Sequence, residues 1–108
     1  MGYHIVKPEQ SVDLYVERST YTDTFVQWGK KKDFLDLGFD VKRLERADRT
    51  SDSSYVGKYS WDEDSVYNWG GYGFIYRSQF LLVLALLAQG AEENDPRILA
   101  LVHSWDEE

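Results

Sequence analysis

The sequence predicts an α+β fold in which an N-terminal antiparallel sheet of about four or five strands packs against two C-terminal helices. Two observations lead to this prediction. Apolar residues alternate with polar ones over the first part of the chain, and they recur at helical spacing after residue 74. Strands therefore precede helices rather than alternating with them, which is typical of an antiparallel sheet with helices on one face.

The length of 108 residues is that of one domain. We expect this single domain, residues 1–108, to be strand-rich over residues 1–73 and helical over residues 74–105, with an acidic tail at residues 106–108.

The first three strands follow from residue type and alternation. Residues 3–6 form a short apolar segment that ends near Pro8, and residues 12–18 place alternate apolar side chains on one face. Residues 20–28 are rich in Thr, aromatic and β-branched side chains, which suit a pleated surface. A turn at residues 19–20 would join the last two strands into a hairpin.

The middle of the chain is less regular. A short helix is expected over residues 30–37, because Gly38 stands where a helix C-terminus favours glycine. The expectations for the segments that follow are a strand or a helical turn at 39–45, a polar loop at 48–54, a strand with one aromatic face at 55–61, an exposed turn at 62–64, and a loop or irregular strand at 65–73.

Two helices complete the prediction. Residues 74–89 are apolar almost all round, so this helix should be buried, and Gly90 should end it. Asp95 and Pro96 are an N-cap and a first-turn proline for a second helix that continues to Trp105. The uninterrupted apolar run, residues 80–88, is nine residues long, whereas a membrane span needs about 20.

Composition limits the function classes. The net charge is −7, and residues 50–108 hold three basic residues against ten acidic ones. This balance argues against direct binding of nucleic acid and favours a partner protein with a basic surface. The chain has no cysteine, so disulfides and thiolate chemistry are excluded. No apolar leader segment precedes the first charges, and we expect a cytoplasmic protein without a membrane segment.

Aromatic residues gather between residues 55 and 76, which hold eight of the seventeen in the chain. With neighbouring Ser, Gly and Asn, they resemble the composition of antibody binding loops, where stiff aromatic rings supply contact area. The alternative is that they form the core beneath the helices. Three aromatics, Tyr67, Trp69 and Tyr72, flank glycines in the expected loop and are the better candidates for a surface position. The predicted partner-binding residues are Tyr59, Trp61, Asp62, Glu63, Asp64, Tyr67, Asn68, Trp69 and Tyr72.

Catalytic and metal-binding patterns are not recognisable in the sequence. The two histidines, His4 and His103, are far apart, and His103 is expected near the end of the last helix, beside the negative end of its dipole. The glycine-rich segment 70–73 lacks the spacing of a dinucleotide fingerprint and the lysine of a P-loop. We therefore expect no enzyme activity, no metal and no cofactor.

Three functions remain open. The first is a protein-binding module of the inhibitor or immunity type, such as a phage-encoded inhibitor of bacterial defence, that covers a basic nucleic-acid-binding or catalytic surface of its partner. The analogy rests on size, charge and composition alone. The second is a binder of a sugar or nucleotide that uses the aromatic loop. The third is a structural or assembly subunit that forms a homodimer through the C-terminal helices.

Overall fold

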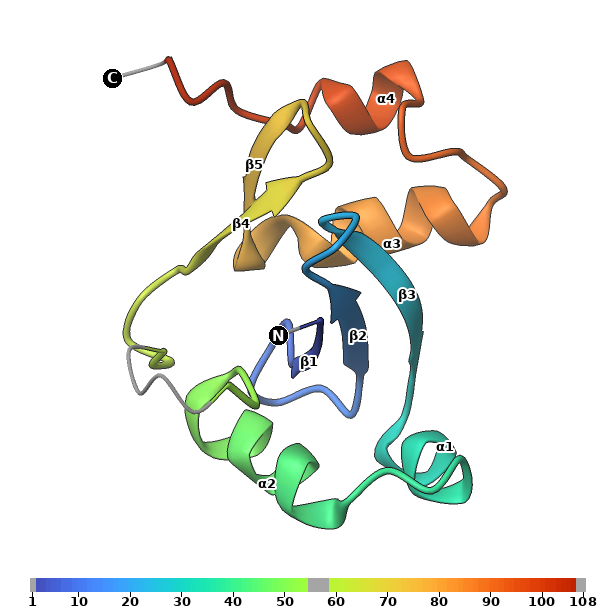
Figure 1. Cartoon of the computed structure of the whole chain (residues 1–108), viewed down its shortest axis with the longest axis vertical. Coiled ribbons are helices and arrows are strands. Elements are labelled where there is room, and N and C mark those ends of the chain that lie inside the picture. The colour runs from blue at the N-terminus through green and yellow to red at the C-terminus, as the bar shows by residue number, and fades with distance from the viewer. Residues whose placement is uncertain (1, 55–58, 107–108) are drawn as a thin grey trace.

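The computed structural model describes residues 2–54 and 59–106, and these residues form an α+β fold (Figure 1). In chain order the elements are β1 (Tyr3–Val6), β2 (Tyr15–Ser19), β3 (Thr24–Gly29), α1 (Lys31–Asp36), α2 (Val41–Thr50), β4 (Val66–Trp69), β5 (Gly73–Tyr76), the 3-10 helix η1 (Arg77–Gln79), α3 (Phe80–Ala88) and α4 (Pro96–Leu99).

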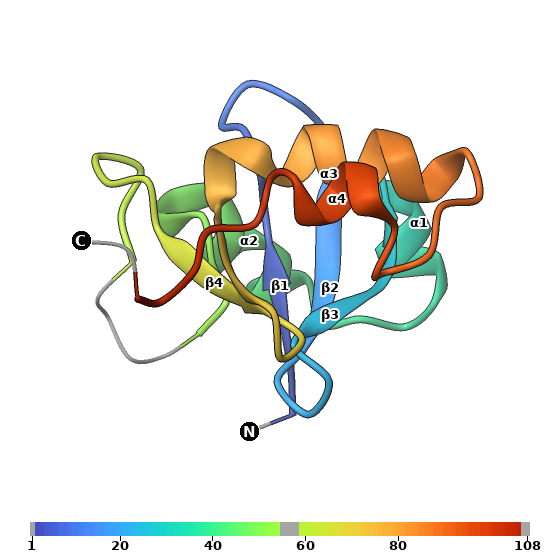
Figure 2. The ribbon, with the colours of Figure 1, turned by 90° about the horizontal axis from the view of Figure 1, so that it is seen from above.

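The five strands form two sheets rather than the one sheet predicted. Strands β1, β2 and β3 form a three-stranded antiparallel sheet in that order, and β4 and β5 form a separate antiparallel hairpin. Helices α1 and α2 lie on one side of the three-stranded sheet, and the hairpin and α3 lie on the other (Figure 1). Helix α4 lies beyond α3, farther from the sheet (Figure 2). The helices therefore cover both faces, not one.

Each face of the three-stranded sheet has its own apolar cluster. Val6 and Val16 are paired across β1 and β2, and they pack with Phe25 against the hairpin and α3. Ile5 and Tyr15 point to the opposite face, because side chains alternate along a strand, and they pack against the first two helices. Both faces are therefore buried, which explains why β1 and β2 carry apolar residues at successive positions.

The hairpin predicted between residues 12 and 28 is confirmed. Its turn covers residues 20–23, with Asp23 in a left-handed conformation (φ 56°), so β3 begins four residues later than expected. The pairing of Glu17 with Gln27 and of Arg18 with Phe25 leaves Val26 as an extra residue in β3. This β-bulge bends β3, as bulges do.

Helix α1 agrees with the expectation for residues 30–37, and Gly38 follows it with a positive φ of 94°. The strand considered for residues 39–45 is wrong, because α2 occupies residues 41–50. The Asp40 carboxylate accepts from the Lys42 amide at 2.9 Å and caps this helix. Leu44 and Ala47, three residues apart, are both fully buried on one side of the helix.

The polar loop predicted at residues 48–54 is wrong for residues 48–50, which belong to α2, and correct for residues 51–54, which lie outside the named helices and strands. Helix α2 continues to Thr50, Ser51 ends it in a left-handed conformation (φ 83°), and residues 51–53 are buried along the free edge of β1. The Lys7 amide donates to the Ser51 carbonyl at 2.8 Å, and the Ser53 amide donates to the Ile5 carbonyl at 2.8 Å. These polar residues are buried because they satisfy the backbone of an edge strand.

Residues 66–76 form the β4–β5 hairpin, so the strand alternative considered for residues 65–73 is confirmed over β4, whereas the helix expected from residue 74 is wrong at its start. Residues 74–76 belong to β5, and helical structure begins only at Arg77. Two hydrogen bonds stabilise the transition from β5 to η1. The Gln79 side chain accepts from the Tyr76 amide at 2.9 Å, and the Asp64 carboxylate accepts from the Ser78 amide at 2.9 Å. These bonds occupy amides that a helix start would leave unpaired.

The last helix is shorter than predicted. Asp95 and Pro96 begin α4 as expected, but the helix ends at Leu99 instead of reaching Trp105. His103 leaves the helical path and pairs with Phe74, through amide–carbonyl bonds of 2.9 and 2.8 Å in the two directions. His103 thus forms an isolated β-bridge to β5, and the expected interaction with a helix dipole does not occur. Among the helices of the described residues, none has the length and apolar character to cross a membrane.

Candidate functional site

The nine predicted contact residues lie in three parts of the molecule instead of forming one surface. Tyr59, Tyr67 and Asn68 line a cleft beside the three-stranded sheet. Trp61 begins the turn that contains the acidic residues 62–64, which lies before β4. The third group, Trp69 and Tyr72, lies at the opposite end of the hairpin. Residues 55–58, the first part of the expected aromatic strand, fall outside the described residues, and residues 59–61 are not a strand.

The expected surface position is wrong for two of the three aromatics near the glycines. Tyr67 is 5% exposed and Trp69 is 0% exposed, whereas Tyr72 is 52% exposed. The physical reason is the strand: alternate side chains of β4 point into the core, and its buried members are the two large aromatics. The Trp69 indole Nε1 donates to the Glu93 carbonyl at 2.9 Å, so its polar group is satisfied inside.

Arg77 fixes the turn at residues 62–64. Its guanidinium lies over the Trp61 ring at 4.7 Å and donates to the Pro8 carbonyl at 2.9 Å and to the Glu63 carbonyl at 2.8 Å. The Asp62 and Glu63 carboxylates are exposed on this turn. We call residues 62–64 the acidic turn. Hydrogen bonds within the chain hold it at two points, the Glu63 carbonyl and the Asp64 carboxylate.

The outer side of the hairpin next to this turn is aromatic. Val66 pairs with Tyr76 and Asn68 with Phe74, so all four side chains point to the same side. Trp105 packs on Phe74 with 4.4 Å between ring centroids, and the exposed fraction of Trp105 is 56%. We call this surface the hairpin face; its residues are Val66, Asn68, Phe74, Tyr76, His103 and Trp105.

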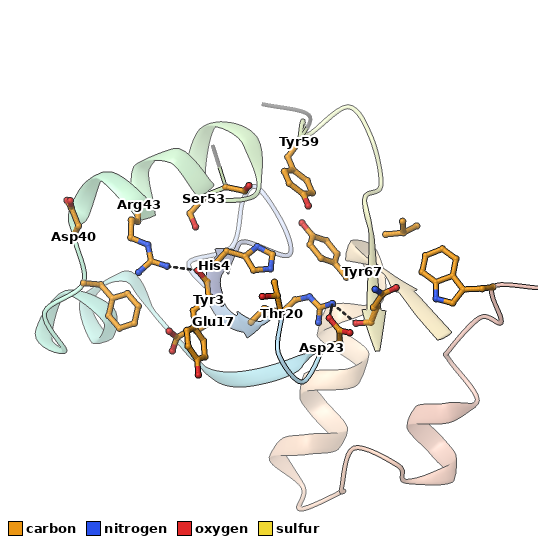
Figure 3. Close-up of a pocket in the computed structure, with 16 residues that line it drawn as sticks. Tyr3, His4, Glu17, Thr20, Asp23, Asp40, Arg43, Ser53, Tyr59 and Tyr67 are labelled. Atoms are coloured by element: carbon orange, nitrogen blue, oxygen red, sulfur yellow. Dashed lines mark hydrogen bonds and ion pairs between the residues drawn. The ribbon is translucent and has the colours of Figure 1, made fainter. Parts of the chain in front are cut away.

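A cleft of about 1080 Å³ lies where the end of the three-stranded sheet meets β4. His4 comes from β1, Arg18 from β2 and Tyr67 from β4, while Tyr59 comes from the segment before the acidic turn. Figure 3 shows His4, Tyr59 and Tyr67 turned toward one another. The rings of Tyr59 and Tyr67 are parallel, with 5.9 Å between their centroids.

Asp52 is the buried centre of a polar network at this cleft. Its side chain is fully buried, and its oxygens lie 3.0 Å from His4 Nδ1. The Tyr67 hydroxyl donates to Asp52 Oδ2 at 2.7 Å, and the Ser54 amide donates to Oδ1 at 2.8 Å. Burial, and then the Asp52 charge, raise the pKa of Tyr67 well above its usual range. The tyrosine therefore stays a neutral donor.

Removing the Tyr67 hydroxyl tests how far this network stabilises the fold. We expect Tyr67→Phe to lower the free energy of unfolding by about 1–3 kcal/mol, because a buried carboxylate loses a donor. Urea unfolding followed by circular dichroism measures the change. The matched control is Tyr72→Phe, whose exposed ring should make this change neutral within about 0.5 kcal/mol. Equal stabilities of the two variants would contradict a structural role for the hydroxyl.

Arg18 lies beside this network. It pairs directly with His4 across β1 and β2 and is 3% exposed. Its Nη2 donates to the Asn68 carbonyl, and it forms an ion pair with Asp23 at the long distance of 3.7 Å. Burial lowers the pKa of Arg18, an effect that the Asp23 charge partly offsets. The guanidinium also lies over the Tyr67 ring at 5.2 Å.

His4, Arg18 and Asp52 are not among the contact residues predicted from the sequence. The burial of Arg18 could have been predicted. It follows Leu14 and Val16 at a spacing of two residues, so it lies on the face of residues 12–18 that was expected to be buried. No sequence pattern predicts the contact between His4 and Asp52, because 48 residues separate them and only the pairing of residues 51–53 with β1 brings them together.

Comparison with known proteins assigns no family: no family model, no curated protein and no solved structure matches the chain. Within residues 2–54 and 59–106, no group of three or more His, Asp or Glu side chains is placed to hold a metal ion.

Proposed function

We propose that the chain is a protein-binding module, acting by binding rather than catalysis, that docks onto a basic surface of a partner protein. The docking surface is the hairpin face together with the acidic turn. One observation carries this proposal: exposed aromatic side chains lie next to exposed carboxylates on an ordered turn. Aromatic anchors supply binding energy at protein interfaces, and carboxylates supply electrostatic complementarity to a basic partner.

Contacts within the chain hold the acidic turn and the hairpin face in place, which supports docking without a large rearrangement. Arg77 holds the acidic turn through a backbone carbonyl of that turn, and the exposed side chains of Asp62 and Glu63 form no hydrogen bond or ion pair among residues 2–54 and 59–106. Phe74 and Trp105 pack on each other, which leaves fewer rotamers to be lost on binding. A preordered surface loses less conformational entropy when it binds.

The partner class follows from charge. The net charge of −7 favours encounter with a cationic groove, such as the nucleic-acid-binding or catalytic surface of another protein. A module that covers such a groove would act as an inhibitor or an immunity-type protein, of which phage-encoded inhibitors of bacterial defence are one kind. The protein would then work in the cytoplasm, where such partners are found.

The acidic turn gives the first test of this proposal. We expect the double variant Asp62→Asn, Glu63→Gln to lose most of the partner captured from a lysate of the source cells at about 0.15 M salt. Both substitutions keep side-chain size and remove only charge. Capture by the unchanged protein should fall at about 0.5 M salt, because added salt screens exposed charges. Quantitative mass spectrometry of the captured proteins measures both effects.

The control variant is Glu92→Gln, Glu93→Gln, which removes the same charge from two exposed acids elsewhere on the surface. If the control loses the partner to the same extent, net charge rather than the acidic turn controls binding. If neither variant nor salt changes the captured proteins, docking through the acidic turn is wrong.

Self-association through the C-terminal helices is a second candidate, and exposed apolar residues on α3 favour it. Leu82 is 56% exposed and Leu81 is 37% exposed, whereas Phe80, Val83 and Leu84 are buried within the same chain. A homodimer would cover the two exposed leucines. Light scattering at several protein concentrations separates the candidates, because a dimer doubles the mass, and Leu82→Lys should return that mass to the monomer value.

A further inference from the structure

Two buried arginines, Arg77 and Arg18, differ in how many of their guanidinium nitrogens have a hydrogen-bond acceptor. Arg77 has two carbonyl acceptors and a tryptophan ring against its guanidinium, and among the described residues its buried Nε has no acceptor. Arg18 has one carbonyl acceptor and a long ion pair, and both its Nε and its Nη1 lack a hydrogen-bond partner within the described part of the chain. An unpaired buried donor is costly, and one on a charged group more so. The structure around Arg18 therefore lacks an acceptor.

His4 stands next to this incomplete guanidinium. The two residues form a directly opposed pair across β1 and β2, so their side chains leave the same face of the sheet about 5 Å apart at Cβ. Buried Asp52 engages His4 Nδ1, which leaves Nε2 as the other ring nitrogen, and the ring lines the cleft. In its imidazolium form His4 can donate through Nε2 while Nδ1 donates to Asp52.

We propose that the cleft is a binding site for a small organic oxyanion, a carboxylate or a phosphate ester, whose oxygens accept hydrogen bonds from Arg18 and His4. The guanidinium fork matches the geometry of both oxyanions. This site borders the proposed docking surface, because Val66, Asn68 and Trp105 line the cleft and also belong to the hairpin face. The hydrogen bonds from Arg18 and His4 to the oxyanion need no partner protein.

The rest of the cleft limits the charge and shape of the ligand. Glu17, Asp23 and Asp40 also line it, so their negative charges weaken the binding of a doubly charged anion relative to a singly charged one. Tyr3, Phe39 and Tyr59 provide an apolar wall for the body of the ligand. A site of this composition, with few polar groups among aromatic side chains, is typical of small-molecule pockets.

The Arg18 side-chain Nε–H signal in a ¹H–¹⁵N NMR spectrum reports directly on this site. We would titrate the unaltered protein with phosphate, acetate and benzoate, each up to about 50 mM, which covers weak binding. Chloride keeps the ionic strength constant. We expect a saturable shift of the Arg18 signal with at least one probe, and no matching shift of the Arg77 Nε–H signal, which serves as an internal control.

The three probes distinguish the possible ligands. A shift with phosphate alone identifies a phosphate ester as the ligand class, and a shift with acetate and benzoate identifies a carboxylate. Tighter binding of benzoate than of acetate would show that the apolar wall contacts the body of the ligand. If no probe gives a saturable shift, or if Arg18 and Arg77 shift together, the proposed site is wrong.

A variant pair adds a second readout. Arg18→Met should weaken the binding of the best probe about tenfold or more, because a charge-assisted hydrogen bond is lost. The matched control is Arg49→Met, which removes the same charge from an exposed position on α2. Equal weakening by both variants would overturn the proposal; if Arg18→Met does not fold, the titration of the unaltered protein still decides it.

Discussion

Replacing Gly73 by alanine is expected to lower the free energy of unfolding by about 3 kcal/mol or more, through strain and overpacking. A Cβ atom at this position would lie 2.1 Å from the His103 carbonyl oxygen and 3.0 Å from Val102 Cγ1. The nearest atom belongs to the backbone, so no side-chain rotation relieves the clash. The φ angle of +150° adds strain for any residue with a side chain.

Gly71 provides the matched control for this prediction. A Cβ there would meet no atom within 4 Å, and Gly71 is not among the glycines with positive φ. Gly71→Ala should therefore be neutral or slightly stabilising, by up to about 1 kcal/mol. Urea unfolding of both variants gives the comparison, and a Gly73→Ala protein as stable as Gly71→Ala would show that His103 does not pack against Gly73 as described.

Replacing Trp69 by alanine has a comparable expected cost, about 3–5 kcal/mol, because a large buried side chain leaves a cavity. The Trp69 ring is fully buried and packs edge-on against Phe25 with 5.1 Å between centroids. The substitution also leaves the Glu93 carbonyl without its indole donor. Thermal and urea unfolding should both detect this loss.

Tyr72→Ala is the control for the Trp69 variant. Tyr72 lies three residues away and is half exposed, so its removal should change stability by no more than about 0.5 kcal/mol. A small effect of Trp69→Ala, equal to that of the control, would contradict the burial of Trp69 and support a position at the surface.

Local sequence signals predicted part of the fold correctly. A short apolar segment and a proline located β1, alternation and residue types over residues 12–28 located the β2–β3 hairpin, and Asp95 with Pro96 located the start of α4. These features depend on short-range chemistry: strand propensity, proline geometry and capping. The α+β class followed from them, although both faces of the larger sheet are covered.

The errors arose where distant residues decide the structure. Phe74 belongs to a strand because it pairs with Asn68 of β4 and bridges to His103, and no local pattern distinguishes this from the start of the apolar helix. The segment 51–53 is buried because it completes the edge of β1. Polar composition predicts a loop there, but it does not predict that pairing with β1 buries these residues.

The candidate sites show the same division. Composition indicated the acidic turn at residues 62–64, and its exposed carboxylates need no distant partner to be recognised. The cleft could not be predicted, because His4, Arg18 and Asp52 come from three separate segments. The aromatics at 67 and 69 carried both interpretations, and the alternation of β4 decides that they are core.

The bridge between Phe74 and His103 can form only after most of the chain has been synthesised on the ribosome. Phe80, Val83 and Leu84 of α3 belong to the same apolar cluster as Ile98, which is translated later. Until residues 98–103 have emerged, the nascent chain exposes this apolar helix and leaves β5 without its last backbone partner. Exposed apolar surface and unpaired strand edges make incomplete chains prone to aggregate. A chaperone that binds nascent apolar segments would therefore encounter this chain at α3.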